Sequence, residues 1–203
     1  IYTKTLKQAD ELGDKRIMGI SLGNLANYFN VKNDFDTAFE YYTRCIEIME
    51  NIGDKYHLGT VLNNFGSLFS MKSGYKKNIY YLTLSLKIWE KLDDMRGTAG
   101  VLGNIGNSYA NQGDLNKALG YFNRSIEIYK KFGIESGLGN VISNIGMVYN
   151  NKGDNKKALD FFIRSLKKCK ELGDKRGMGN SLNNIGLVYK DKADYDKALD
   201  YLE

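Results

Sequence analysis

Apolar residues near the C-terminal end of the chain follow a helical spacing. In one stretch they stand at positions i, i+3, i+4 and i+7, on one face of a helix: Leu182, Ile185, Gly186 and Tyr189. After a polar turn at 192–194, a second apolar face follows, formed by Ala198, Leu199 and Leu202. The pattern predicts two amphipathic helices joined by a tight turn.

The same pattern recurs every 40 residues along the chain. An asparagine occurs in every copy, at Asn24, Asn64, Asn104, Asn144 and Asn184. Two neighbouring positions recur with it, as Ala26, Gly66, Gly106, Gly146 and Gly186 and as Phe29, Phe69, Tyr109, Tyr149 and Tyr189. A fixed period of about 20–50 residues is typical of solenoids, in which each repeat packs only on its neighbours.

Aspartates mark the expected helix starts. Asp194, like Asp34, Asp114 and Asp154, stands where an N-cap is expected, and glycine precedes two of these aspartates and can end the previous helix. Gly-Asp pairs also separate successive copies, as at Gly53-Asp54 and Gly173-Asp174. The sequence therefore predicts an all-α chain of repeated helix–turn–helix units.

The motif Leu-x-Asn-Ile-Gly-x-x-Tyr, then Gly-Asp, then Lys-Ala-Leu-x-Tyr/Phe-Phe, resembles the tetratricopeptide repeat (TPR) family over essentially the whole chain. This repeat has 40 residues and no proline, whereas the common unit of the family has 34 and a proline near its end. It is similar to the longer repeats of bacterial signalling arrays, kinesin light chains and spindle-orientation adaptors. The resemblance implies a right-handed α-solenoid of antiparallel helix pairs that binds proteins or peptides and is not catalytic.

The period also gives the domain organisation, a single TPR array over residues 1–203. Residues 1–12 align with 41–52 and form the end of a preceding repeat; the repeats that follow are 13–52, 53–92, 93–132, 133–172 and a truncated 173–203. We therefore expect a fragment of a longer array. At its ends Tyr2, Leu6, Leu199 and Leu202 would expose apolar surface, which favours end-to-end self-association.

Two repeats depart from the pattern. In the second, Gly74 replaces the capping aspartate and Asn78 replaces the recurring alanine, so its second helix should pack least well. The third has glycine at every third position of its first helix, at Gly97, Gly100, Gly103 and Gly106. Glycine destabilises a helix by about 0.5–1 kcal/mol relative to alanine, and we expect these two repeats to be the weakest.

Charge and composition indicate no catalytic or cofactor chemistry. The net charge of +5 is mild, and the recurring lysines at the start of second helices predict a solvated face rather than a nucleic-acid surface. One histidine, His57, and two distant cysteines, Cys45 and Cys169, offer neither a catalytic triad nor a zinc cluster. We expect no enzyme activity, no metal or other cofactor, no nucleic-acid or membrane partner, and a cytoplasmic location.

A candidate binding surface lies on the first helices, opposite their core stripe, where the resemblance places the concave groove. The expected ligand-binding residues are Asn24, Asn64, Asn104, Asn107, Asn140, Asn144, Asn180, Asn184, Arg96 and Arg176. Asparagine is a mediocre helix former, so its recurrence needs a reason. Its amides could pair with the backbone of an extended peptide, or they could link neighbouring repeats, and the two roles can coexist.

The ligand itself is expected to be a protein or peptide segment that is weakly charged or mildly acidic. Arg96 and Arg176 would favour a carboxylate, while Met147 and Leu187 offer apolar contact. Two other functions stay open: a scaffolding or self-associating array, and a sensor or regulatory segment of a larger signalling protein.

Overall fold

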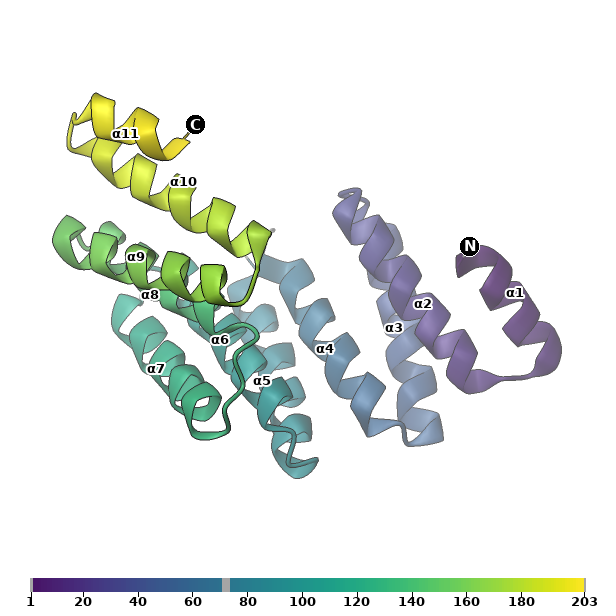
Figure 1. The fold of residues 1–203 in the computed structure, drawn as a ribbon. Coiled ribbons are helices and arrows are strands. Elements are labelled where there is room, and N and C mark those ends of the chain that lie inside the picture. Colours follow the sequence, from purple (N-terminus) through teal and green to yellow (C-terminus); the bar gives the residue numbers. More distant parts are fainter. Residues whose placement is uncertain (1, 71–73, 203) are drawn as a thin grey trace. The chain divides into compact units, whose positions relative to one another are not determined.

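The structure, a computed structural model, describes residues 2–70 and 74–202, and all its regular elements are helices (Figure 1). The first helices of the repeats are α2 (Lys15–Val31), α4 (Lys55–Ser70), α6 (Met95–Asn111), α8 (Leu138–Asn151) and α10 (Lys175–Asp191). The second helices are α1 (Tyr2–Leu12), α3 (Phe35–Ile52), α5 (Tyr75–Lys91), α7 (Leu115–Lys131), α9 (Asn155–Glu171) and α11 (Tyr195–Leu202).

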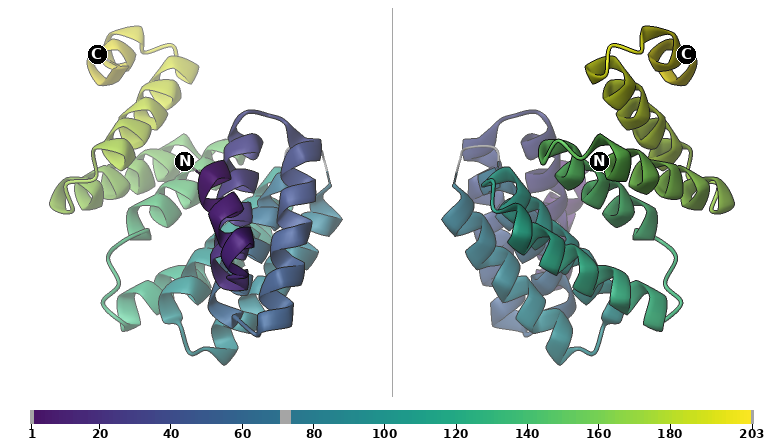
Figure 2. Two further views of the ribbon diagram at one scale, coloured as in Figure 1. Left: turned by 90° about the vertical axis from the view of Figure 1, so that its right-hand side faces the viewer. Right: turned by 90° about the vertical axis from the view of Figure 1, so that its left-hand side faces the viewer.

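The helices fall into two compact units, residues 1–104 (unit 1) and 105–203 (unit 2). Within each unit, helices that follow one another pack side by side and alternate in direction (Figure 1, Figure 2). The predicted all-α fold of stacked helix pairs is therefore confirmed.

Aspartate caps start most of these helices, as predicted. Asp14, Asp34, Asp114, Asp154 and Asp174 each accept a hydrogen bond from the backbone N–H three residues later. Helix α8 is an exception, because Ile134 stands where the other first helices have their capping aspartate. It begins only at Leu138, after Gly137 with φ 89°.

Glycines allow the two helices of a repeat to approach closely. A Cβ atom added to Gly106 would lie 2.6 Å from the Phe122 ring, and one added to Gly146 would lie 2.7 Å from the Phe162 ring. At Gly97 it would lie 2.5 Å from Trp89, in the preceding helix. Space for aromatic side chains thus explains two of the four glycines in the third repeat.

A second recurring contact joins the far end of each helix pair. In all five repeats two rings twelve positions apart are stacked, for example Tyr109 on Tyr121 at 5.4 Å and Tyr149 on Phe161 at 5.4 Å. Lys117 lies over Tyr109 and also forms an ion pair with the capping carboxylate of Asp114. The recurring lysines are therefore exposed, as predicted, but they also hold the start of the second helix.

The second repeat accommodates its irregular residues by hydrogen bonding. Asn78 is fully buried, and its Nδ2 donates to the Gly66 carbonyl at 2.7 Å. Gly74 provides no side-chain cap for α5, as predicted. A buried hydroxyl helps to hold this helix, since Ser85 Oγ donates to the Gly59 carbonyl at 2.7 Å.

Candidate ligand-binding site

Five of the predicted binding residues meet in one cavity of unit 2, between α8 and α10. Its volume is about 520 Å³, and the predicted residues that line it are Asn140, Asn144, Asn180, Asn184 and Arg176. The four asparagines come together because they stand at equivalent positions of neighbouring first helices. The other lining residues are Ser143, Met147, Ser165, Asp174, Gly177 and Asn183.

The cavity is lined by exposed side chains and by one buried hydroxyl. Asn140, Asn180 and Arg176 are exposed, and Met147 is 48% exposed. Ser165 is buried, and its Oγ donates to the Gly139 carbonyl at 2.8 Å and lies 2.9 Å from Ser181 Oγ. The hydroxyl of Ser165 is thus bonded within the protein, which leaves the exposed side chains for a ligand.

Two opposite charges line the cavity without neutralising each other. Asp174 Oδ1 accepts the Gly177 backbone N–H at 2.9 Å and caps α10. Among the residues that the structure describes, neither Asp174 nor Arg176 takes part in an ion pair. A ligand can therefore meet both a carboxylate and a guanidinium here.

Three recurring asparagines form hydrogen bonds between neighbouring first helices. Asn104 Nδ2 donates to Asn63 Oδ1 at 2.8 Å, and Asn184 Nδ2 donates to Ser143 Oγ at 3.2 Å, in both cases 41 residues back. The residue 41 positions before Asn64 is Gly23, which has no side chain to accept a hydrogen bond. Asn64 Nδ2 instead donates to Asn27 Oδ1 at 3.2 Å. The linking role therefore has direct contacts in the structure.

Asn24 and Asn64 line an equivalent but much smaller cavity in unit 1, between α2 and α4. Its volume is about 80 Å³, and it is also lined by Ile20, Cys45 and His57. Asn104, Asn107 and Arg96, the remaining predicted residues, lie on α6 and line neither cavity. The structure thus brings together seven of the ten predicted residues, in two separate places.

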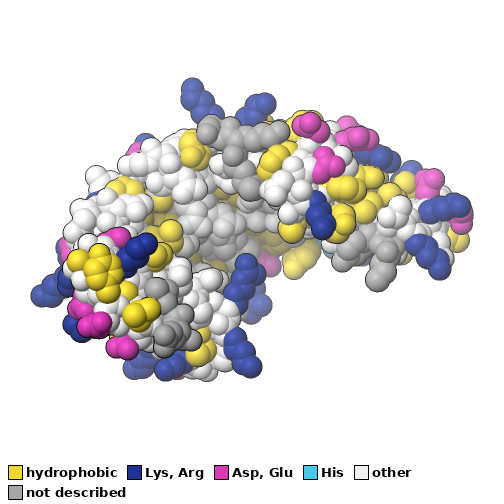
Figure 3. Space-filling view, turned by 90° about the horizontal axis from the view of Figure 1, so that it is seen from above, with side chains coloured by type: hydrophobic (Ala, Val, Ile, Leu, Met, Phe, Trp, Pro, Cys, Tyr) yellow, Lys and Arg dark blue, Asp and Glu magenta, His cyan; other side chains and the backbone are white. Residues whose placement is uncertain are grey.

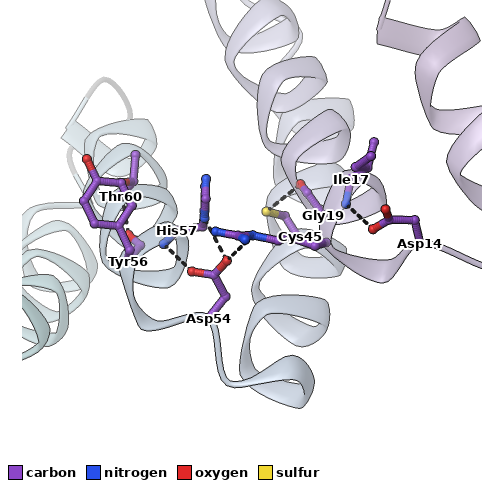
Figure 4. A network of polar contacts seen from close by, with 9 residues as sticks. Asp14, Ile17, Gly19, Cys45, Asp54, Tyr56, His57 and Thr60 are labelled. Carbon is purple, nitrogen blue, oxygen red and sulfur yellow. Dashed lines mark hydrogen bonds and ion pairs between the residues drawn. The ribbon is translucent and has the colours of Figure 1, made fainter.

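A polar network beside the unit 1 cavity was not predicted (Figure 4). Asp54 Oδ2 lies 2.9 Å from His57 Nδ1 and 3.0 Å from Arg16 Nε. Burial opposes ionisation of Asp54, yet hydrogen bonds from the His57 amide and imidazole, with the charges of His57 and Arg16, hold its pKa below the ordinary value. No repeat pattern signals this network, because the equivalents of Arg16 and His57 around Asp174 are Ser136 and Gly177.

Cys45 lines the same cavity, and Tyr42 is bonded to Asn27, another of its lining residues. Tyr42 OH donates to Asn27 Oδ1 at 2.6 Å, and Cys45 Sγ donates to the Gly19 carbonyl at 3.0 Å. Burial raises the pKa of Tyr42 to about 12 and that of Cys45 to about 11. Both groups are therefore neutral and structural at physiological pH.

On the face shown in Figure 3, basic and acidic side chains are interspersed. Within the described residues, no group of three or more potential ligands could hold a metal ion. In the same part of the chain no helix is both long and apolar enough to cross a membrane.

Apolar exposure at the chain ends is partly as predicted. Leu199 is 57% exposed, together with Tyr195 at 64%, whereas Leu6 is partly buried against the core. The side chains of Tyr2 and Leu202 lie outside the described residues. Self-association through these ends stays a prediction.

The stacked helix pairs and their recurring contacts define a helical repeat protein. Residues 137–203 and 99–132 match family models described as tetratricopeptide repeat. These two stretches are tetratricopeptide repeats, as their motifs predict. A comparison of the chain's sequence with curated proteins finds no match.

Solved structures with the same fold come from bacterial and archaeal proteins among others. BtubC (BKLC) from P. vanneervenii superposes with a TM-score of 0.79 and 19% identity, over 99% of this chain and 85% of that one. A signal transduction ATPase with numerous domains and a tetratricopeptide repeat sensor, from Pyrococcus horikoshii, gives 0.80 and 18% over 98% of this chain and 31% of that one.

A Rap protein complexed with competence and sporulation factor gives a TM-score of 0.79 and 17% identity, over 92% of this chain and 52% of that one. The chain therefore spans a third to a half of the length of these last two proteins. At such identities the likeness shows the fold alone. The repeat type itself indicates a protein-binding or regulatory role.

Proposed function

We propose that the chain is a binding module for an extended protein or peptide segment, which lies across the first helices and is held by asparagine side chains. The observation that carries the proposal is the 520 Å³ cavity of unit 2, where amides surround the guanidinium of Arg176. In the residues described, the exposed amides of Asn140 and Asn180 have no protein partner. They are available to a ligand backbone.

The chemistry of an amide suits this task. Each side chain offers two donors and an acceptor, which matches the N–H and C=O of an extended peptide. Such pairing gives affinity that depends little on the ligand's sequence. Selectivity then comes from the exposed side chains of Arg176, Met147 and Leu187, which favour a weakly charged or mildly acidic segment with some apolar contact.

A regulatory segment of a larger signalling protein is compatible with this binding role. One structure of the same fold is named as a repeat sensor and another was solved with a bound factor. In such a protein the array would receive the ligand and pass the binding event to attached domains. We propose no catalytic role for the repeats and a location in the cytoplasm.

A display library of random peptides, selected on the wild-type chain, tests the proposal. For an enriched peptide, the double variant Asn140→Ala, Asn180→Ala should bind about tenfold more weakly, because two hydrogen bonds of about 0.5–1.5 kcal/mol each are lost. Its stability should be unchanged, since these amides bond to nothing in the described structure. Fluorescence anisotropy measures the affinity and urea denaturation the stability.

The matched control is Asn104→Ala, Asn184→Ala, which removes amides that link neighbouring helices. This variant should lose stability as well as affinity. Wild-type affinity in Asn140→Ala, Asn180→Ala would contradict the proposed role of these asparagines in binding. A library from which no peptide is enriched would contradict the binding role itself.

A further inference from the structure

The two cavities lie at equivalent positions in different repeats of the chain. Eight residues that line the cavity of unit 2 are the equivalents, 120 positions later, of eight that line the cavity of unit 1. Ile20 corresponds to Asn140, and His57 corresponds to Gly177. Unit 1 therefore shows what the protein itself places at positions that unit 2 leaves open.

In unit 1 the capping carboxylate is occupied by basic groups. Asp54 Oδ1 accepts the His57 backbone N–H at 3.1 Å, as an N-cap does. Asp54 Oδ2 receives the imidazole of His57 at 2.9 Å and the guanidinium of Arg16 at 3.0 Å (Figure 4). This oxygen of Asp54 thus binds two basic side chains, one from its own helix and one from the preceding first helix.

In unit 2 the equivalent carboxylate, that of Asp174, also caps its helix, but the basic partners of Asp54 have no counterparts there. Asp174 Oδ1 accepts the Gly177 N–H at 2.9 Å. The equivalents of Arg16 and His57 are Ser136 and Gly177, and neither side chain carries a charge. Asp174 lines the larger cavity and has no ion-pair partner among the described residues.

The other capping aspartates do not share this situation. Three of those that cap second helices are already paired with a lysine three residues later, at Asp114–Lys117, Asp154–Lys157 and Asp194–Lys197. Asp14 and Asp34 line neither cavity. Asp94 caps α6 through the Gly97 N–H at 2.8 Å, but it lines neither cavity. Asp174 alone of these combines an unpaired carboxylate with a cavity large enough for a side chain.

We propose that Asp174 is a subsite for a basic group of the ligand, a guanidinium, imidazolium or ammonium, which takes the place that Arg16 and His57 fill at Asp54. Arg176, in the same cavity, receives a carboxylate or carbonyl of the same segment. The inference rests on the proposed function and specifies its ligand: a segment with neighbouring basic and acidic groups and little net charge.

Methylguanidinium is a suitable probe, because it carries the group in question and nothing else. In ¹H–¹⁵N spectra of the whole chain it should shift the Gly177 amide saturably, since that N–H is bonded to Asp174. The variant Asp174→Asn keeps an acceptor for the cap but lacks the charge, and it should abolish the shift. An unshifted Gly177 amide in the wild type would overturn the proposal.

Two internal controls distinguish a specific subsite at Asp174 from nonspecific pairing of methylguanidinium with carboxylates. The Gly97 amide, bonded to Asp94, should shift much less than Gly177, and the His57 amide should not shift because Asp54 is occupied. In Arg16→Ala, His57→Gly the amide of residue 57 should begin to respond. Equal shifts at Gly97 and Gly177 would show nonspecific pairing and would contradict the subsite.

Peptides enriched from the display library distinguish this inference from the proposed function. They should contain a basic residue and bind at least tenfold more weakly to Asp174→Asn than to the wild type or to Asp94→Asn. Saturable methylguanidinium binding without any peptide binding would support the subsite and contradict the peptide-binding function. Peptides that bind Asp174→Asn as well as the wild type would support the function and overturn the subsite.

Discussion

Unit 1 and unit 2 place equivalent cavities between neighbouring first helices, yet their volumes are about 80 Å³ and 520 Å³. Side chains account for part of the difference. His57 extends from a position that is Gly177 in unit 2, and Ile20 stands where unit 2 has Asn140. A few substitutions on one repeated backbone thus decide whether the site is filled by the protein itself or open to a ligand.

The packing within helix pairs also differs between the units. In unit 2 the ring of Phe162 lies over Gly146, where a Cβ atom would come within 2.7 Å of it. In unit 1 the equivalent Leu82 lies near Gly66, and Asn78 adds a hydrogen bond to the Gly66 carbonyl. Unit 2 relies here on an aromatic side chain, whereas unit 1 combines a smaller side chain with a buried polar contact.

The largest expected effect comes from removing that ring. Phe162→Ala should lower the free energy of unfolding by about 3–5 kcal/mol, because Phe162 is 2% exposed and Gly146 has no side chain to fill the cavity. Leu82→Ala in unit 1 should cost about 2–5 kcal/mol. Urea denaturation measures both values.

Hydrogen exchange shows where the loss falls. In an array whose repeats contact only their neighbours, Phe162→Ala should reduce protection in α8, α9 and α10 and leave α2 and α3 nearly unchanged. A uniform loss over both units would show that they unfold together. That outcome would remove the energetic distinction between them.

The fold was predictable because the same physical pattern recurs in several repeats. The apolar stripe, the capping aspartates and the small residues at the helix crossing each recur at a fixed spacing. The late start of α8 was missed: the side chain of Ile134 cannot accept a hydrogen bond from a backbone N–H, and the prediction treated the fourth repeat as regular. A single residue that breaks the period has a local effect that the period cannot show.

The candidate site was predictable only in outline. The recurrence of Asn144 and Asn184 placed them on one face, and they line the same cavity. Their partners were not predictable, because the bond from Asn184 to Ser143 depends on the distance between two helices. The network of Arg16, Asp54 and His57 occurs once, and a pattern based on recurrence overlooks it.

A smaller effect is expected from acid. Because the folded-state pKa of Asp54 is lowered, its ionised form stabilises the fold at pH values above the pKa of an unfolded aspartate, about 3.9. This stabilisation should disappear as the pH falls through the lower folded-state value. The stability difference between the wild type and Asp54→Asn should therefore be constant near neutral pH and shrink below about pH 4.

Thermal unfolding of both chains between pH 2.5 and 7 measures this difference. Arg16→Ala is the control, since it removes one of the two charges beside Asp54. In this background the pH range over which the stability difference changes should be narrower. A difference that stays constant down to the lowest pH would show that the network does not contribute to stability.

The smallest effect is an expected absence of change in unit 1 when unit 2 is weakened. Each unit contains one buried cysteine, Cys45 in unit 1 and Cys169 in unit 2. Burial raises the pKa of Cys45 to about 11 and also raises that of Cys169, so neither thiol should react with a disulfide reagent at neutral pH until its surroundings open. The two labelling rates therefore report the local opening of each unit.

In Phe162→Ala, labelling of Cys169 should accelerate by at least tenfold, while that of Cys45 should change by less than about twofold, because coupling passes only between neighbours. Mass spectrometry of the labelled peptides separates the two sites, and Leu82→Ala should reverse the pattern. If both rates rise together in either variant, the chain opens as one cooperative body, and the difference between the two cavities lies in their side chains alone.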